Sequence, residues 1–444
     1  MHDFATSSDP AVQTQLDRLA ALSLPQGRLG LETMRALLAR LRDPHLRLPP
    51  VFHVAGTNGK GSTCAFLRAM LEAEGYSVHA TTSPHLVRYN ERIRVAGKLI
   101  ANARLAELLA EVLDASEGLS PSFFEVTIAA SFLEFARVPA DACVVEVGLG
   151  GRFDATNVIP RPAVCGIAAL GIDHERFLLA PEDGVPTEPL ARIAFEKAGI
   201  AKPGVPLVTL DYPDAARAAI AATAARMGAP VFARNAAWGV KPGGGDCHVV
   251  YGEGDACYFH GPPPAMPGRH QVSNAGLAIA MLRRQSLLPV SEDAMKAGVA
   301  NARWPARMQR LAPGPLTGLA PGRTIWLDGG HNADAGLAIA RFFGGIEPDA
   351  ANPLQRLHLV IGMIEGKDPA ALTGPLGSSI ASLTVVPVPM HDHHPSAAFG
   401  PDALAAPDVP AALAALPEDR LPVLIAGSLY LAGEVLRLNG EQPD

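Results

Sequence analysis

Hydrophobic positions along the chain follow two periods in turn, and these periods predict alternating strands and helices. Residues 51–56 (VFHVAG) fit a buried strand, and residues 62–75 fit an amphipathic helix that ends at Gly75. Residues 142–151 (ACVVEVGLGG) and 163–171 are short apolar runs, typical of strands that are covered on both faces. Strands that alternate with helices predict a doubly wound α/β fold.

The same hydrophobic pattern predicts the remaining helices and strands and two irregular regions. Residues 1–15 are expected to form an arm without regular structure. Residues 235–270 are rich in glycine and proline, with short alternating segments that predict small antiparallel strands. The other expected helices are 31–42, 123–138 and 274–285, and the other expected strands are 77–84, 324–330, 356–363, 382–388 and 422–428.

The length of the chain predicts more than one domain. A chain of 444 residues is too long for a single ordinary hydrophobic core. A new strand–helix series begins after Trp304-Pro305, which places a boundary near residue 300. We therefore expect a doubly wound N-terminal domain over 1–300, and a smaller Rossmann-like α/β domain over 301–444.

Charge and cysteine content exclude several classes of function. The formal net charge is −7 and the charged residues are spread along the chain, so the sequence has no basic cluster of the kind that binds nucleic acid. Five cysteines without a CxxC pair favour neither a disulfide framework nor a structural zinc site. Residues 1–19 lack the basic and apolar regions of a signal peptide, and no run of 18 apolar residues occurs. A cytoplasmic location without a membrane partner is expected.

The stretch between the first strand and the following helix has the composition of a phosphate-binding loop. Gly56, Gly59 and Gly61 would let backbone N–H groups approach a phosphate, and the helix N-terminus favours negative charge. Lys60 would lie against the β- and γ-phosphates of ATP. The pattern is a variant of the usual one, because Gly61 separates Lys60 from Ser62. The alternative is a glycine turn with a surface lysine.

Polar residues follow other predicted strands, where ligands gather in open α/β sheets. Ser83, Glu91, Arg92 and Arg94 cluster after the strand 77–84, although a solvated polar loop has the same composition. Because this cluster follows the end of a strand, these side chains are candidates for contact with a ligand.

One carboxylate lies in an unusually apolar setting. Glu146 is flanked by valines in mid-strand, where an unpaired charge is costly, and Mg²⁺ beside ATP phosphates is its natural partner. A buried arginine is the alternative partner. His174 also follows a strand, but a lone histidine is more often structural than a ligand. Lys197 taken alone is a lysine that complements the dipole at a helix C-terminus.

The second domain carries a similar turn. Asp328, His331 and Asn332 lie between a predicted strand and a predicted helix, in the order WLDGGHNADA. Arg307, near the domain boundary, is placed to contact phosphate, and a linker salt bridge is the alternative.

Taken together, nine stretches resemble one family. They occur in the family's order from about residue 28 to residue 435: HVAGTNGKGS, TSPHLVRYNERI, SFFEVT, EVGLGGRFDATN, DHE, EKAGI, HQVSNA, DGGHN and GSLYLAGEV. The chain resembles the folylpolyglutamate synthase family of Mur-ligase-like, ATP-dependent amide ligases, including its bifunctional bacterial members. No single stretch is specific, but the set is.

The resemblance implies roles for particular residues. It implies catalytic roles for Lys60, Lys197 and His331, with Lys197 carbamylated. The residues that it assigns to ATP are Gly59, Lys60, Gly61, Ser62, Asn274, Arg307 and Asp328. Those that it assigns to Mg²⁺ are Ser83, Glu146 and His174. Those that it assigns to the pteroate substrate are Arg28, Leu29, Gly30, Ser122, Phe123, Phe124, Glu125, Phe153, Asp154 and Ala155.

The sequence departs from the family pattern in three places. Residues 178–189 (LLAPEDGVPTEP) form an apparent insert between His174 and Lys197. The usual Pro-Gly-Arg reads Pro-Ala-Arg before the second domain, with Arg307 kept, and the usual DGAHN reads DGGHN. The insert predicts a longer loop on the metal side of the site.

The activity implied by the resemblance is ATP-dependent ligation of L-glutamate to dihydropteroate, followed by addition of further glutamates to folates, through an acyl phosphate. A monofunctional folylpolyglutamate synthase is the nearest alternative. A regulatory NTPase has no use for the DGGHN and HQVSNA stretches, and a cell-wall amino-acid ligase does not fit the folate-type motifs. The expected partners are small molecules, and the chain is expected to act as a monomer.

Overall fold

The computed structural model describes residues 5–22, 30–243, 248–254, 256–344 and 355–444. The chain divides into two compact units. The first comprises Met1–Ala265 and Gln271–Arg303, and the second comprises Met266–His270 and Trp304–Asp444. The second unit therefore takes in a short segment that precedes residue 300.

The first unit is built on an eight-stranded sheet. Its strands are β1 (Val51–Ala55), β2 (Val78–Thr81), β3 (Ile93–Val95), β4 (Lys98–Leu99), β5 (Ala142–Glu146), β6 (Val164–Ile167), β7 (Leu207–Thr209) and β8 (Val231–Ala233). They lie in the order β4-β3-β2-β5-β1-β6-β7-β8. The six strands from β2 to β8 in this order are parallel, and β3 and β4 are antiparallel to their neighbours.

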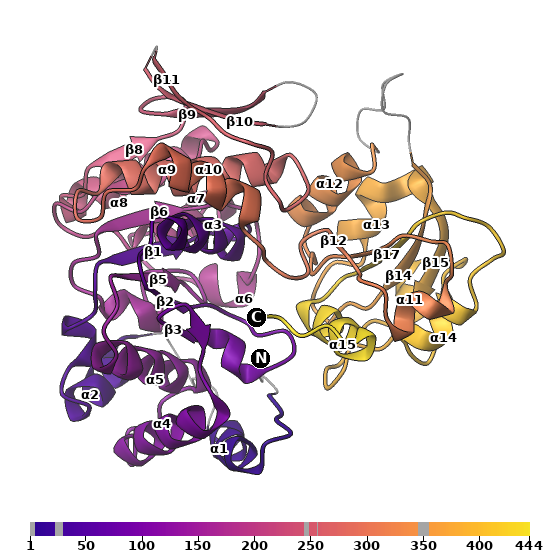
Figure 1. Ribbon diagram of the computed structural model, residues 1–444, viewed down its shortest axis with the longest axis horizontal. Helices are drawn as coiled ribbons and strands as arrows, with labels where there is room; N and C mark the ends of the chain where they lie inside the picture. The colour runs from indigo at the N-terminus through magenta and orange to yellow at the C-terminus, as the bar shows by residue number, and fades with distance from the viewer. Residues whose placement is uncertain (1–4, 23–29, 244–247, 255, 345–354) are drawn as a thin grey trace. The chain divides into compact units, whose positions relative to one another are not determined.

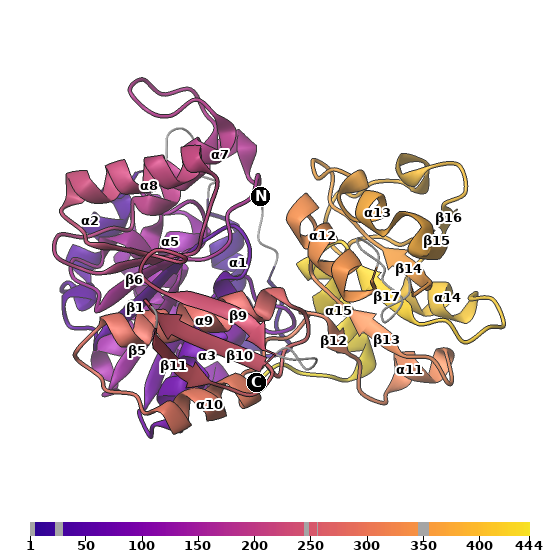
Figure 2. The same ribbon diagram turned by 90° about the horizontal axis from the view of Figure 1, so that it is seen from above.

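Helices cover both faces of this sheet (Figures 1 and 2). The helices described in this unit are α1 (Pro10–Ala20), α2 (Glu32–Arg40), α3 (Lys60–Ala73), α4 (Asn102–Ala115), α5 (Phe123–Arg137), α6 (Glu175–Leu178), α7 (Pro189–Ala198), α8 (Asp214–Met227), α9 (His270–Arg284) and α10 (Glu292–Asn301). Side chains alternate between the faces of each strand. Val145 packs with the cluster around α5, whereas Gly166 lies against Met281 of α9. This arrangement confirms the predicted doubly wound α/β fold.

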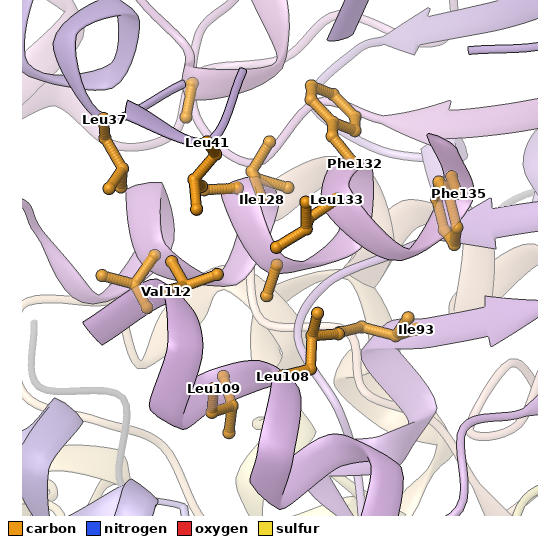
Figure 3. Close-up of a cluster of buried hydrophobic side chains, with 14 of the residues drawn as sticks. Leu37, Leu41, Ile93, Leu108, Leu109, Val112, Ile128, Phe132, Leu133 and Phe135 are labelled. Carbon is orange, nitrogen blue, oxygen red and sulfur yellow. The ribbon is translucent and has the colours of Figure 1, made fainter. Parts of the chain in front are cut away.

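A large core cluster lies between the sheet and the N-terminal helices (Figure 3). Leu37 of α2, Leu108 of α4, and Ile128 and Phe132 of α5 are fully or almost fully buried there. Burial of side chains of this size supplies about 1.5–3 kcal/mol each. The cluster holds α5 in place, and the N-terminal end of α5 carries four of the residues expected to bind substrate.

The structure of the N-terminal arm differs from the sequence-based expectation. Residues 1–15 were expected to lack regular structure, yet Pro10–Ala20 form α1. Asp9 caps this helix by accepting hydrogen bonds from Ala11 N and Val12 N, and Leu16 lies buried in the core one turn after Val12. The predicted antiparallel strands of 235–270 are present as β9 (Gly239–Gly243), β10 (His248–Glu253) and β11 (Ala256–His260).

The second unit has its own six-stranded sheet. Its strands are β12 (Gln309–Arg310), β13 (Ile325–Leu327), β14 (Leu357–Ile361), β15 (Ile380–Val385), β16 (Leu404–Ala405) and β17 (Val423–Ala426), in the order β12-β13-β17-β14-β15-β16. Only β12 is antiparallel to its neighbour. Its helices are α11 (Pro315–Leu319), α12 (Ala333–Phe342), α13 (Ala370–Leu376), α14 (Val409–Ala414) and α15 (Leu429–Asn439). This is the Rossmann-like architecture that the sequence predicts.

Candidate active site

Four loops of the first unit leave the same edge of its sheet. They follow the carboxyl ends of β1, β2, β5 and β6, which lie next to one another as parallel strands. Most of the candidate nucleotide and metal residues lie in these loops, at the strand ends or in the first turn of α3. In an open α/β sheet this edge is where ligands bind, and the order of the strands reverses beside β1.

The loop after β1 is shaped by glycine and by the loop after β6. Gly59 has a φ of +79°, and a Cβ at this position would collide with the side-chain amide of Asn274. Thr57 N and Asn58 N donate to Ala169 O at 2.8 and 3.2 Å. The loop is therefore held on one side by α9 and on the other by the segment after β6.

The next helix begins at the predicted phosphate-binding residues. Gly59 precedes α3 and has no side chain to cap it, and Lys60 is the first helical residue. The first backbone N–H groups of a helix are ready donors to an anion. Lys60 Nζ donates to Gly56 O at 3.0 Å and to Thr57 O at 3.2 Å, so its amine lies across the loop. Ser62 is buried and accepts from Gln271 Nε2 at 3.4 Å.

Lys197 reaches the same loop from the end of α7. Its side chain is buried, and Nζ donates to Gly56 O at 2.9 Å. Burial, followed by the nearby charge of Lys60, lowers the pKa of Lys197 to about 7, while the charges of Asp173, Asp154 and Glu196 oppose the shift. A lysine in this setting carries a large neutral fraction at pH 7.

Two of the three predicted metal ligands meet at this edge. Glu146, at the end of β5, is buried and accepts from Ser83 N at 3.2 Å. His174 directly precedes α6 with a φ of +55°, and its backbone N–H donates to Asp173 Oδ1 at 2.7 Å. Among the described residues, no group of three His, Cys, Asp or Glu side chains is arranged to hold a metal. The predicted set contains only two such side chains, with the Ser83 hydroxyl as the third.

The sequence reasoning missed Asp173. It is buried, it accepts from the N–H of His174, and its charge acts on Lys197. Its position in the sequence, after β6 and immediately before His174, could have identified it.

Glu91 shapes the loop that presents Ser83. Its carboxylate accepts from the backbone N–H groups of Leu86, Val87 and Arg88 at 2.8, 2.9 and 2.6 Å. The polar stretch after β2 is thus an ordered loop.

The predicted substrate residues at the start of α5 include a helix cap. Ser122 Oγ accepts from Glu125 N at 3.2 Å, and Glu125 Oε2 accepts from Ser122 N at 2.8 Å, which forms a capping box. Phe123 lies 5.4 Å from the guanidinium of Arg92, a buried residue of the polar stretch. Ser122 and Glu125 therefore fix the helix that presents the two phenylalanines.

Aromatic side chains line the loop after β5. A Cβ on Gly148 would lie 2.5 Å from the ring of Phe124, so this glycine permits the ring to pack on the loop. The guanidinium of Arg152 lies 4.3 Å from the ring centroid of Phe153. Ala155 is buried at the start of a 3₁₀ turn, Ala155–Val158.

Asp154 faces inward. Its Oδ2 accepts from Leu149 N at 2.8 Å, and its Oδ1 accepts from Thr156 N at 3.0 Å and from Thr156 Oγ1 at 2.5 Å. His53 of β1 is fully buried, and its Nε2 lies 2.8 Å from Thr156 Oγ1. Burial lowers the pKa of His53 to about 3, so the ring is neutral. Because Thr156 donates to Asp154, His53 Nε2 carries the proton in this chain. The sequence reasoning missed His53 and Thr156.

The remaining predicted substrate residues lie at the start of the chain. Arg28 and Leu29 fall outside the described residues, and Gly30 is two residues before α2.

In the second unit, the turn after β13 is held by its own aspartate. Asp328 is buried, its Oδ2 accepts from Met308 N at 2.8 Å, and its Oδ1 accepts from Gly330 N at 2.7 Å. Arg307 Nη1 donates to Ala306 O at 3.3 Å, and a Cβ on Gly329 would lie 3.1 Å from that same Nη1. Asp328 therefore ties the arginine-bearing segment to the turn.

The same turn places a histidine that the sequence identified, and a neighbouring histidine that it missed. His331 Nδ1 lies 2.9 Å from Gly329 O, and Asn332 caps α12 by accepting from Ala335 N at 3.0 Å. Burial lowers the pKa of His270; Asp328 raises it and Arg307 lowers it. His270 thus lies near two of the residues assigned to ATP. It is the first residue of the HQVSNA stretch.

The chain is similar to proteins of known activity along most of its length. It is 34% identical over 382 residues to human mitochondrial folylpolyglutamate synthase, covering 77% of this chain but only 60% of the human protein. It is 34% identical over 328 residues to the Bacillus subtilis dihydrofolate synthase/folylpolyglutamate synthase, covering 69% and 70% of the two chains. It is 30% identical over 452 residues to the Saccharomyces cerevisiae dihydrofolate synthetase, covering 93% and 98%. No protein-family model matches the chain.

Solved structures agree with these similarities. Escherichia coli FolC in complex with DHPP and ADP superposes with a TM-score of 0.82 and 28% identity, over 97% of each chain. A bifunctional folylpolyglutamate synthase/dihydrofolate synthase with Mn, AMPPNP and L-glutamate bound gives a TM-score of 0.81 and 28% identity, over 97% of this chain and 98% of the other. Among the described residues of this chain, no helix is long and apolar enough to span a membrane.

Proposed function

Because the chain belongs to the folylpolyglutamate synthase and dihydrofolate synthase family, we propose that it is an ATP-dependent ligase that joins L-glutamate to dihydropteroate and adds further glutamates to folates. The observation that carries the proposal is the glycine loop after β1, which begins a helix and holds the amines of Lys60 and Lys197. The compounds bound in similar structures, namely ADP with DHPP, and AMPPNP with L-glutamate, support the same substrates.

The reaction needs an activated carboxylate, because a carboxylate anion is a poor electrophile. A carboxylate oxygen of the pterin substrate attacks the γ-phosphorus of ATP, and ADP leaves. The amine of L-glutamate then attacks the acyl carbon, phosphate leaves from the tetrahedral intermediate, and the nitrogen gives up a proton to form the amide. The protein's part is to position the reactants and to stabilise charge.

The residues of the first unit would stabilise the phosphates. The N–H groups at the start of α3 and the Lys60 amine would supply dipoles and positive charge to the β- and γ-phosphates. In the second unit, Arg307 and Asp328 are proposed to contact the nucleotide, with Asp328 holding the arginine-bearing segment to its turn. We assign His331 to the same machinery.

The donors of Ser83, Glu146 and His174 fit a divalent metal ion. Two oxygen donors and one imidazole suit Mg²⁺ or Mn²⁺, and the backbone N–H of Ser83 donates to the Glu146 carboxylate, which keeps the two residues close together. Mg²⁺ held there would neutralise charge on the phosphates. A buried Glu146 is consistent with this role, since an isolated carboxylate in that setting would be costly.

We further propose that Lys197 is carbamylated in the active enzyme. The neutral amine attacks the carbon of CO₂, which forms a carbamate and releases a proton. A pKa of about 7 provides the neutral amine at physiological pH. The modification would turn a buried cation beside Lys60 into an anion, which relieves the repulsion between the two lysines.

The pterin substrate is proposed to bind near Phe123, Phe124 and Phe153. Phe124 packs on the glycine loop after β5, and the α5 cap fixes its helix. Asp154 is proposed to act by shaping this loop, since its carboxylate accepts hydrogen bonds from groups within the chain.

The choice of pterin acceptor tests the proposal and its nearest alternative. Purified protein would be incubated with ATP, Mg²⁺ and L-glutamate, and with either dihydropteroate or tetrahydrofolate, while ADP and glutamylated product are measured. Product from both acceptors is expected. Product from tetrahydrofolate alone would show a monofunctional folylpolyglutamate synthase. ADP formation at the same rate without glutamate would reject ligation altogether.

A further inference from the structure

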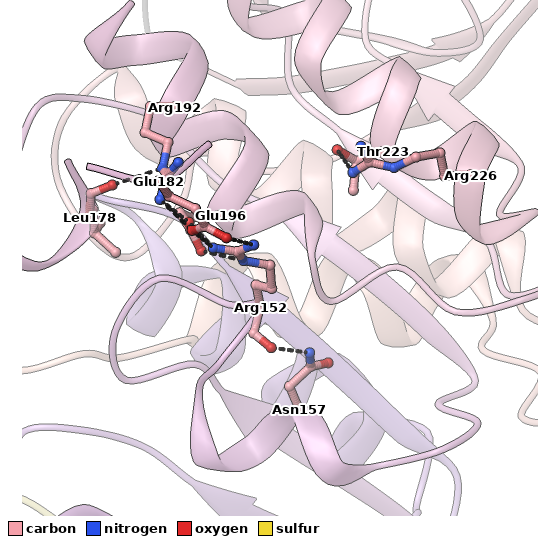
Figure 4. A network of polar contacts seen from close by, with 8 residues as sticks. All are labelled: Arg152, Asn157, Leu178, Glu182, Arg192, Glu196, Thr223 and Arg226. Carbon is pink, nitrogen blue, oxygen red and sulfur yellow. Dashed lines mark hydrogen bonds and ion pairs between the residues drawn. The ribbon is translucent and has the colours of Figure 1, made fainter. Parts of the chain in front are cut away.

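The segment between His174 and α7 carries a carboxylate that the proposed reaction does not use. Glu182, in the apparent insert, binds two arginines from different segments (Figure 4). Its Oε1 and Oε2 accept from Arg152 Nη1 and Nη2 at 3.1 and 2.5 Å, and Oε2 also accepts from Arg192 Nη2 at 2.9 Å. A single side chain therefore fastens the insert both to the loop after β5 and to α7.

Glu196 closes the arrangement into a ring of alternating charge. It binds Arg152 Nη2 at 2.8 Å and Arg192 Nη2 at 3.0 Å. The side chains are 22%, 16%, 6% and 7% exposed for Arg152, Glu182, Arg192 and Glu196. Removal of one anion would leave two largely buried guanidinium groups sharing a single carboxylate, which is strongly unfavourable.

This ring, which we call the Arg152–Glu196 ring, adjoins the backbone that carries Lys197. Arg152 N donates to Glu196 O at 2.8 Å. A Cβ on Gly151 would lie 2.8 Å from Glu196 O and 2.9 Å from Lys197 O, so the loop and the end of α7 are in close contact. A shift of Arg152 would therefore be transmitted to Lys197.

The ring also adjoins the segment that carries His174. Arg192 Nε donates to Leu178 O at 3.1 Å, at the end of α6. The helix begins directly after His174. One arginine thus holds the end of α6 and the carboxylate of the insert at the same time.

We propose that Glu182 is a positioning residue that holds the C-terminal end of α7, and with it Lys197, against the loop after β5. The role of Lys197 in ligation rests on the proposed function, whereas the contacts of Glu182 with Arg152 and Arg192 do not depend on that function. Glu182 touches neither substrate nor reacting atoms in this assignment; it acts through Arg152 and Arg192.

The test compares Glu182→Gln with Asp183→Asn, a matched change at the exposed neighbour of Glu182 in the same insert. Two measurements are made on the full chain: steady-state kinetics of glutamate ligation, and hydrogen exchange by mass spectrometry. Glu182→Gln should lower kcat about tenfold with the KM for ATP within about twofold, because misplaced catalytic groups lose rate before they lose binding. Peptides covering 193–201 should exchange faster. Asp183→Asn should match the wild type in both measurements.

Each result bears on the proposal. Wild-type kcat and wild-type exchange in Glu182→Gln would overturn it, and so would faster exchange spread evenly over the first unit, which indicates general destabilisation. If Glu182→Gln does not fold, Glu182→Asp keeps the charge on a shorter side chain and should show intermediate kcat and exchange; wild-type values there would overturn the proposal. If the wild type forms no glutamylated product, the proposed function fails, and the exchange comparison alone decides whether Glu182 holds α7.

Discussion

Lys60 and Lys197 donate hydrogen bonds to the same carbonyl oxygen, that of Gly56, at 3.0 and 2.9 Å. Two ammonium groups on one oxygen repel each other, and the charge of Lys60 is the second cause, after burial, of the low pKa of Lys197. The glycine loop after β1 therefore brings the two amines together, and the charge of Lys60 disfavours the protonated form of Lys197.

Replacement of Lys197 should separate nucleotide binding from catalysis. Lys197→Ala is expected to lower kcat at least about 100-fold, because charge stabilisation of this kind is often the largest catalytic term. The dissociation constant for ATP, measured by calorimetry, should change little. Short carboxylates such as acetate should restore part of the activity by supplying the missing anion. Lys296→Ala, on the exposed face of α10, is the control. Full turnover in Lys197→Ala would contradict the assignment.

The low pKa of Lys197 also predicts how stability depends on pH. The folded value is about 7 and the ordinary value is 10.5, so between these limits the unfolded chain binds the additional proton. The free energy of unfolding should therefore rise with pH across this window, by at most about 1.4 kcal/mol per pH unit from this group. Below pH 7 the cost of the buried cation is fully present.

Denaturant unfolding from pH 6 to 10 checks this sign. The stability of the wild type relative to Lys197→Met should change little below pH 7 and then increase up to pH 10, because the ordinary pKa of 10.5 lies above this range. Parallel curves for the two proteins would show that the amine does not titrate in this range.

Glu146→Gln should weaken the use of Mg²⁺. The amide keeps the shape of the side chain that accepts from Ser83 N, but it removes the negative charge. A titration of activity against Mg²⁺ should therefore move to concentrations about tenfold higher or more, as expected for loss of a carboxylate ligand. Glu292→Gln, a matched change at an exposed residue, should leave the dependence of activity on Mg²⁺ concentration unchanged. An unchanged curve for Glu146→Gln would count against this residue as a ligand.

Asp154→Asn should destabilise the loop after β5. Asp154 accepts from Leu149 N, Thr156 N and Thr156 Oγ1, and an amide must turn its NH₂ group toward one of these donors. The expected loss of unfolding free energy is about 1–3 kcal/mol, the cost of an unsatisfied buried group. The KM for dihydropteroate should rise, since Phe153 and Ala155 flank this residue. Asp214→Asn, on an exposed side chain, serves as the comparison. Unchanged stability together with a raised KM would favour direct contact with substrate.

The parts of the structure that follow from local pattern could be predicted from the sequence. The strand, glycine loop and helix around Lys60 have short-range causes: apolar runs, glycines where φ is positive, and a helix start. The turn at Asp328 is predictable for the same reason. The signals for α1 are also local, because Asp9 is a common N-cap residue and Pro10 is favoured as the first residue of a helix.

The other parts depend on contacts between distant segments. His53 and Thr156 are joined by the pairing of β1 with β5 and by the turn that follows β5, and nothing in either neighbourhood indicates the contact. The same holds for Glu182, whose partners lie on two other segments. Charged residues in a loop usually face solvent, so only the packed structure distinguishes a bridging carboxylate from an exposed one.

The central place of β1 has a consequence for biosynthesis. Both of its neighbours in the sheet, β5 and β6, come from much later in the chain. A nascent polypeptide that ends before residue 142 contains the entire glycine loop but neither flanking strand. Long-range pairing of this kind forms slowly. Translation must therefore pass residue 167 before the loop can be fixed, and ATP added to shorter ribosome-bound chains should give no protection from protease.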